Sequence, residues 1–105
     1  MMNHLNNGLL KPDKVGKMAI FRIGAVTKEL GYGSHTSIYE NIRMGLFTKS
    51  VKISSRSVGW PDYEVRAINS ARIAGASEEQ IRELVNKLHL KRTELFQAIE
   101  AGLYE

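Results

Sequence analysis

The chain has 105 residues, of which 43% are hydrophobic, so it fits one domain with a single modest core. It contains no cysteine, which excludes disulfides, thiolate zinc sites and thiol catalysis and agrees with a reducing cytoplasm. The formal net charge of +4 is uneven: residues 1–60 carry nine Lys/Arg against three Asp/Glu, whereas residues 61–105 carry six against eight. We therefore expect a polyanionic partner to bind the N-terminal part.

Residues 1–17 are polar and show no apolar period, which predicts a flexible leader. The longest apolar run near the N-terminus, Met18 to Phe21, is far too short for a signal peptide or a membrane span. We therefore expect a soluble, cytoplasmic protein without membrane contact.

A short strand and a helix are predicted next. Residues 20–23 favour an extended segment, and the four-residue spacing of Val26 and Leu30 predicts a helix over residues 24–30. Residues 31–33, Gly-Tyr-Gly, then form a tight turn, because a glycine commonly ends a helix in the left-handed conformation.

A second short helix is predicted over residues 34–44. Ser34 is a good N-cap, Ile38 and Ile42 form an apolar stripe, and Gly45 ends the helix. Two short helices joined by a glycine turn are typical of a helix-turn-helix.

A small β-hairpin follows over residues 51–60. Val51 and Ile53 alternate with polar residues, residues 54–56 form the turn, and an apolar pattern then resumes. We assign Trp60 to the core, because its large ring ends a strand directly before a helix.

A third helix is predicted to begin near Pro61, which suits the first helical position, and to turn Val65 and Ile68 inward. Gly75 ends it, and residues 77–80, Ser-Glu-Glu-Gln, form a capping box that opens a fourth helix.

The fourth helix carries a clear apolar stripe of Ile81, Leu84, Val85 and Leu88. The charged residues 91–92 interrupt the pattern, so the helix either runs to about residue 101 or breaks there. The later apolar residues are available to a protein partner or to a second copy in a homodimer: Leu95, Phe96, Ile99 and Leu103.

The order helix, glycine turn, helix, hairpin, helix resembles the winged fold of excisionases and MerR-type proteins. Residues 34–39, Ser-His-Thr-Ser-Ile-Tyr, are similar to the start of the recognition helix in AlpA-like phage and prophage regulators. That family's wing and third helix resemble the runs at residues 45–47, 51–53, 58–60 and 64–65. The similarity extends from residue 20 to about residue 90.

This resemblance implies a mainly α fold with a small β-hairpin wing, a winged helix-turn-helix over residues 18–75, and a helical extension over residues 76–105 that packs on it. Two departures from the family pattern stand out. Thr48 and Ser50 occupy places where the family usually has proline, and Glu40 stands where it usually has a basic residue. Glu40 cannot hold a phosphate, so that family role is not transferred.

The second helix is the predicted recognition helix. Its buried isoleucines turn Thr36, Ser37, Glu40 and Arg43 toward solvent. In helix-turn-helix proteins the early residues of this helix reach base edges, and its N-terminal amides can hold a phosphate. The candidate DNA-binding residues here are Ser34, His35, Thr36, Ser37, Tyr39 and Arg43.

Three of these residues also have a simpler interpretation. Ser34 and Ser37 serve as caps on many surface helices, and Tyr39 at the edge of the stripe is equally suited to core packing. Arg43 suits guanine or a phosphate, whereas Glu40 either accepts from cytosine or repels the backbone.

The hairpin region is the predicted wing. Lys49, Lys52 and Arg56 surround a short turn, and no acidic residue occurs between Gly45 and Trp60, which favours contact with a phosphate backbone. Lysines also protect strand edges from aggregation, which is the competing interpretation.

Catalysis and metal binding are not predicted. His4, His35 and His89 are far apart in sequence, and no phosphate loop or nucleophile motif occurs, so no cofactor, metal or small-molecule substrate is expected. The leading hypothesis is a sequence-specific regulator that binds double-stranded DNA of phage or prophage genes. The alternatives are a DNA-bending excisionase and a helical protein-interaction module.

Overall fold

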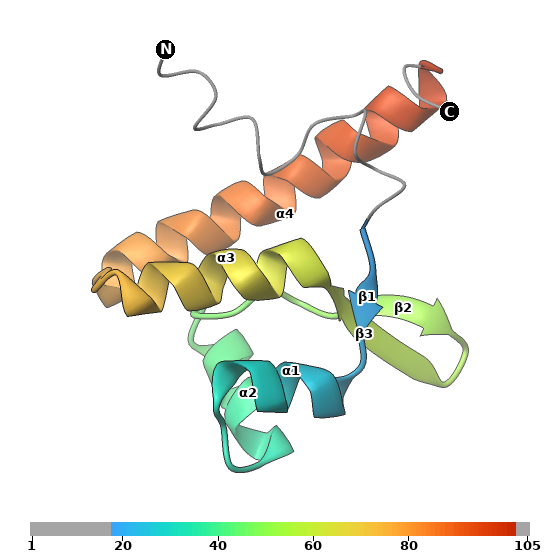
Figure 1. Cartoon of the computed structure of the whole chain (residues 1–105). Coiled ribbons are helices and arrows are strands. Elements are labelled where there is room, and N and C mark those ends of the chain that lie inside the picture. The colour runs from blue at the N-terminus through green and yellow to red at the C-terminus, as the bar shows by residue number, and fades with distance from the viewer. Residues whose placement is uncertain (1–17, 103–105) are drawn as a thin grey trace.

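A computed structural model describes residues 18–102, so the predicted leader and Leu103 lie outside the described residues. The elements in chain order are β1 (Ile20–Phe21), α1 (Ile23–Leu30), α2 (His35–Arg43), β2 (Val51–Ser54), β3 (Ser57–Pro61), α3 (Asp62–Ile73) and α4 (Glu78–Glu100). Helices α1 and α2 lie on the opposite side of α3 from α4, and the strands lie near the end where α3 begins (Figure 1). The protein is a winged helix-turn-helix with a long C-terminal helix, which confirms the predicted fold class.

The helix-turn-helix forms much as its glycine turn predicts. Gly31 ends α1 with a left-handed φ of 74°, a conformation that side chains with a Cβ avoid. Val26 of α1 and Ile38 of α2 are fully buried, and Ile42 is partly buried against the same core. Ser34 occupies the N-cap position with an extended backbone, but its side chain makes no cap hydrogen bond, so the predicted capping interaction is absent.

The predicted hairpin is part of a three-stranded antiparallel sheet in the order β1-β3-β2. Gly59 of β3 is required by this packing: a Cβ there would lie 2.5 Å from Cγ2 of Ile20 and 2.7 Å from the carbonyl oxygen of Phe21. A larger residue at position 59 would therefore push β1 away from the sheet.

The position of Pro61 differs from the prediction. It is the last residue of β3 and the N-cap of α3, with an extended ψ of 134°, rather than the first helical residue. The physical reason is β1: Pro61 pairs with Ile20, and the Asp62 N–H donates to the carbonyl oxygen of Ala19 at 2.8 Å. Strand pairing therefore continues one residue beyond the predicted end.

Helix α4 begins at the predicted capping box: the Gln80 N–H donates to Ser77 Oγ at 3.1 Å, and the Ser77 N–H donates to Gln80 Oε1 at 2.8 Å. From there α4 is continuous to Glu100, so the charged residues 91–92 do not break the helix. It lies antiparallel to α3 (Figure 1), and its buried residues on that side are Ile81, Val85 and Leu88.

Trp60 lies at the centre of the core, as predicted, and is fully buried. Its ring centroid is 6.0 Å from that of Phe47 and 6.3 Å from that of Tyr39, and its indole N–H donates to the carbonyl oxygen of Thr48 at 2.8 Å. The tryptophan therefore joins α2, the segment after it and the hairpin in one packed unit.

Candidate nucleic-acid interface

The exposed face of α2 carries the side chains predicted to read DNA. Thr36, Glu40 and Arg43 are all exposed, and their four- and seven-residue spacing places them along one stripe of the helix. Thr36 and Arg43 are separated by about 10 Å along the helix axis. A stripe of this length matches the reach of a helix laid into a major groove.

The first turn of α2 brings together the other predicted residues of the recognition helix. Ser34, His35 and Thr36 are exposed, and Ser37 is partly buried. The turn contains no acidic residue and no side chain caps it. The Ser37 N–H donates to the carbonyl oxygen of Ser34 at 3.3 Å, whereas the N–H groups of His35 and Thr36 make no hydrogen bond to the described residues. Together with the partial positive charge of a helix N-terminus, these N–H groups can donate hydrogen bonds to a phosphate oxygen.

Tyr39 packs against the core and is also partly exposed. Its side chain packs edge-on against Trp60, yet the residue remains 49% exposed. The ring therefore belongs to the edge of the core, while the exposed part remains accessible from the surface of α2.

Arg43 and Glu40 form an ion pair on the surface of α2, with side chains 70% and 51% exposed. Their three-residue spacing on a helix is a recognised signal for such a pair, which the sequence patterns used above did not include. Glu40 lowers the net positive charge of this face, and an approaching phosphate or base must compete with it for the Arg43 guanidinium.

The wing residues fall into two places. Lys52 of β2 and Arg56 of the turn are exposed on the hairpin itself. Lys49 is also exposed but precedes β2, in the segment that connects α2 to the sheet. Its backbone is held there, because its N–H donates to Nε2 of His89 at 3.0 Å and its carbonyl oxygen accepts from Arg92 at 2.7 Å.

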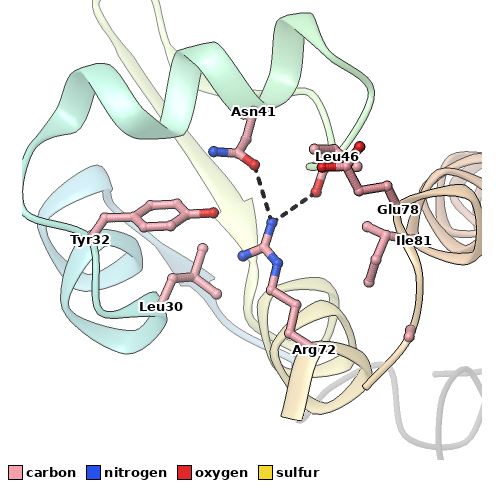
Figure 2. Close-up of a pocket in the computed structure, with 8 residues that line it drawn as sticks. Leu30, Tyr32, Asn41, Leu46, Arg72, Glu78 and Ile81 are labelled. Atoms are coloured by element: carbon pink, nitrogen blue, oxygen red, sulfur yellow. Dashed lines mark hydrogen bonds between the residues drawn. The ribbon is translucent and has the colours of Figure 1, made fainter. Parts of the chain in front are cut away.

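A pocket of 370 Å³ lies between the helix-turn-helix and the junction of α3 with α4 (Figure 2). Arg72 points into it and donates to Asn41 Oδ1 at 3.4 Å and to the carbonyl oxygen of Leu46 at 3.2 Å. Its guanidinium also lies 5.6 Å from the ring centroid of Tyr32. Arg72 thus joins α3 to the turn after α1, to α2 and to the segment after α2.

A buried ion pair, which the sequence did not reveal, joins the second half of α4 to the first turn of α3. Arg92 donates to both carboxylate oxygens of Glu64 at 2.7 Å, and Glu64 is fully buried. The two residues are 28 positions apart, so no local spacing could indicate their contact.

Two side chains near this ion pair have perturbed acidity. Burial, and then the positive charge of Arg92, lower the pKa of His89 from its ordinary value. The imidazole is therefore neutral at pH 7 and can accept the hydrogen bond from the Lys49 amide. Burial, followed by the charge of Glu64, raises the pKa of Tyr63 to about 12.

Within residues 18–102, no group of three or more His, Cys, Asp or Glu side chains is arranged to hold a metal ion. Over the same range, no helix combines the length and apolar character that crossing a membrane requires.

A comparison with protein families gives a match over residues 19–72 to the family described as prophage CP4-57 regulatory protein (AlpA). None of the curated proteins and none of the solved structures gives a significant match to the chain. The matched residues make up just over half of the chain and include the helix-turn-helix, the wing and nearly all of α3. The chain therefore belongs to the AlpA family of prophage regulatory proteins.

Proposed function

We propose that this protein is a sequence-specific, double-stranded DNA-binding transcriptional regulator of phage or prophage genes. The observation that carries the proposal is the exposed N-terminal turn of α2, the second helix of the helix-turn-helix. This turn has neither a side-chain cap nor an acidic residue, and the protein belongs to a family of prophage regulators. A helix in this position is the element that enters the major groove in related folds.

In this proposal the recognition helix reads bases with the exposed stripe that begins at Thr36 and ends at Arg43. The Thr36 hydroxyl can donate or accept, and Arg43 can bind guanine through two hydrogen bonds once it leaves Glu40. Ser34, His35 and Ser37, with the amides of their turn, hold the adjacent phosphates, and the Tyr39 hydroxyl contacts a further phosphate.

The wing supplies contacts that do not depend on sequence. Lys52 and Arg56 of the hairpin, with Lys49 beside it, lie along the phosphate backbone, where each neutralised phosphate releases counterions. These side chains are exposed, and none of them takes part in an ion pair among the described residues.

The salt dependence of DNA affinity tests this division. Fluorescence anisotropy of a labelled duplex should show that Lys52→Ala or Arg56→Ala weakens binding to all duplexes and lowers the log-affinity against log-salt slope by about one. Lys91→Ala is the matched control, because Lys91 lies on α4 and pairs with Glu94. If neither wing variant differs from this control, the wing does not contact the phosphates.

We further propose that the last turns of α4 mediate a homodimer. Phe96 and Ile99, three residues apart on this helix, are 59% and 44% exposed. Sedimentation velocity of Phe96→Ser/Ile99→Ser should show a lower association state than wild type. Leu90→Ser is the control, because Leu90 is also 59% exposed but lies on the opposite face of α4 from Ile99. Equal association in all three proteins would contradict the proposal.

A further inference from the structure

The segment that connects the recognition helix to the wing, residues 44–50 (the connector), contains neither helix nor strand. Side chains from elsewhere in the fold hold its carbonyl oxygens instead. The donors are Arg82 to Met44 at 2.9 Å, Arg72 to Leu46 at 3.2 Å, Trp60 to Thr48 at 2.8 Å and Arg92 to Lys49 at 2.7 Å. The connector conformation therefore depends on three arginines, Arg72, Arg82 and Arg92, which we call the arginine clamp.

Arg92 is the most firmly held member of the clamp. Both oxygens of the buried Glu64 accept from its guanidinium at 2.7 Å, which fixes the planar group from α3 while it donates to the connector. His89, one turn earlier on α4, accepts from the Lys49 N–H at 3.0 Å. The backbone N–H and carbonyl oxygen of one residue at the base of the wing, Lys49, are thus both held by side chains of α4.

Arg82 holds the other end of the connector. It donates to the carbonyl oxygen of Met44, the C-cap residue of α2, and its side chain is 46% exposed. Arg72 acts between the two, because it binds Leu46 of the connector and Asn41 of α2 together (Figure 2).

The guanidiniums of the clamp already donate to carbonyl and carboxylate oxygens of the protein itself. The consequence of the clamp is geometric: the connector joins the last residue of α2 to the first residue of β2, so its shape sets the position of the wing relative to the recognition helix. A duplex that contacts both the wing and the recognition helix binds more tightly if the free protein already holds the two in the right relative position. If it does not, the flexibility that is lost on binding reduces the affinity gained from the second contact.

We propose that Arg82 and Arg92 of α4, together with Arg72, are positioning residues that fix the wing relative to the recognition helix for simultaneous contact with DNA. This role rests on the proposed DNA-binding function. It gives α4, which lies outside the matched residues 19–72, a part in DNA binding without contact to DNA.

Amide hydrogen exchange of the free, full-length protein tests the clamp without DNA. The variants are Arg82→Met, whose exposed side chain can be lost without stranding a buried group, and the pair Glu64→Met/Arg92→Met, which replaces the ion pair with apolar residues of similar size. Lys91→Met is the matched control for the loss of one positive charge on α4. Exchange in the connector, relative to that in α3, should accelerate by about tenfold in the two clamp variants and remain unchanged in the control.

DNA affinity then tests positioning by a double-mutant cycle with the wing residues Lys52 and Arg56. In a wild-type wing, each clamp variant should weaken binding to a selected duplex by about tenfold; in a Lys52→Ala/Arg56→Ala background, the same change should weaken it by less than about threefold. This loss of additivity distinguishes positioning of the wing from general destabilisation, which would reduce affinity by the same factor in both backgrounds.

The outcomes separate the two proposals. Wild-type protein that binds no duplex contradicts the proposed function and the positioning role together. Wild type that binds, with folded clamp variants that bind equally well or lose the same factor in both backgrounds, overturns the positioning role alone. Unchanged connector exchange in both clamp variants also overturns it.

Discussion

Removal of Arg92 should destabilise the protein far more than removal of its partner Glu64. Glu64 is fully buried and receives two hydrogen bonds of 2.7 Å from Arg92, whose own side chain is 24% exposed. Arg92→Met leaves the carboxylate buried without a counter-charge, which typically costs about 3 to 5 kcal/mol. In Glu64→Met the arginine can turn toward water and keep its bond to the connector, so we expect a loss of about 1 to 3 kcal/mol.

The pair Glu64→Met/Arg92→Met should recover most of this stability, because buried ion pairs contribute little more than apolar residues of the same volume. Urea denaturation followed by circular dichroism gives the free energy of unfolding of the wild type, both single variants and the pair. Since a domain of this size has only about 5 to 15 kcal/mol in total, the differences are well within reach of the assay. Equal losses from the two single substitutions, or a pair no more stable than Arg92→Met, would refute the reasoning.

Further predictions concern the core, the connector, pH and the recognition helix. Ile38→Ala should lower the free energy of unfolding by about 2 to 5 kcal/mol in the same assay, because Ile38 is fully buried. Thr48→Val should raise it by about 1 kcal/mol, because the buried Thr48 hydroxyl has no hydrogen-bond partner among the described residues; a loss of stability would show that the hydroxyl is satisfied. The folded-state pKa of His89 lies below its unfolded value, so protonation favours unfolding and stability should fall as pH drops below about 6.5. Denaturation at pH 7.5 and pH 5 should show a smaller fall for His89→Gln than for wild type. Glu40→Gln should tighten binding to every duplex in anisotropy titrations, because it frees Arg43 and removes a negative charge from the face of α2; weaker binding would indicate that Glu40 accepts from a base.

Features set by neighbouring residues could be predicted from the sequence. The glycine that ends α1, the capping box that opens α4 and the buried face of α2 each depend on spacings of four residues or fewer. The exposure of Thr36 and Arg43 follows from the same helical period. The ion pair of Arg43 with Glu40 was missed although its three-residue spacing was visible.

Features set by distant residues could not be predicted. Pro61 remains extended because Ile20 pairs with it from 41 positions away, and the connector is held by arginines 26 to 43 positions away. The position of Glu64 on α3 could be expected from the helical period, but not the burial of its charge, because that depends on Arg92 reaching it from α4.

Selection of bound duplexes from a random pool by the full-length protein tests the central claim most directly, with Thr36→Ala selected in parallel. We predict that wild type enriches one shared sequence, that Thr36→Ala binds this sequence about 1 to 3 kcal/mol more weakly, and that Thr36→Ala retains affinity for random duplex. A pool that remains unenriched, with no duplex bound below high micromolar concentration, would contradict the assignment of this protein as a sequence-specific DNA-binding regulator.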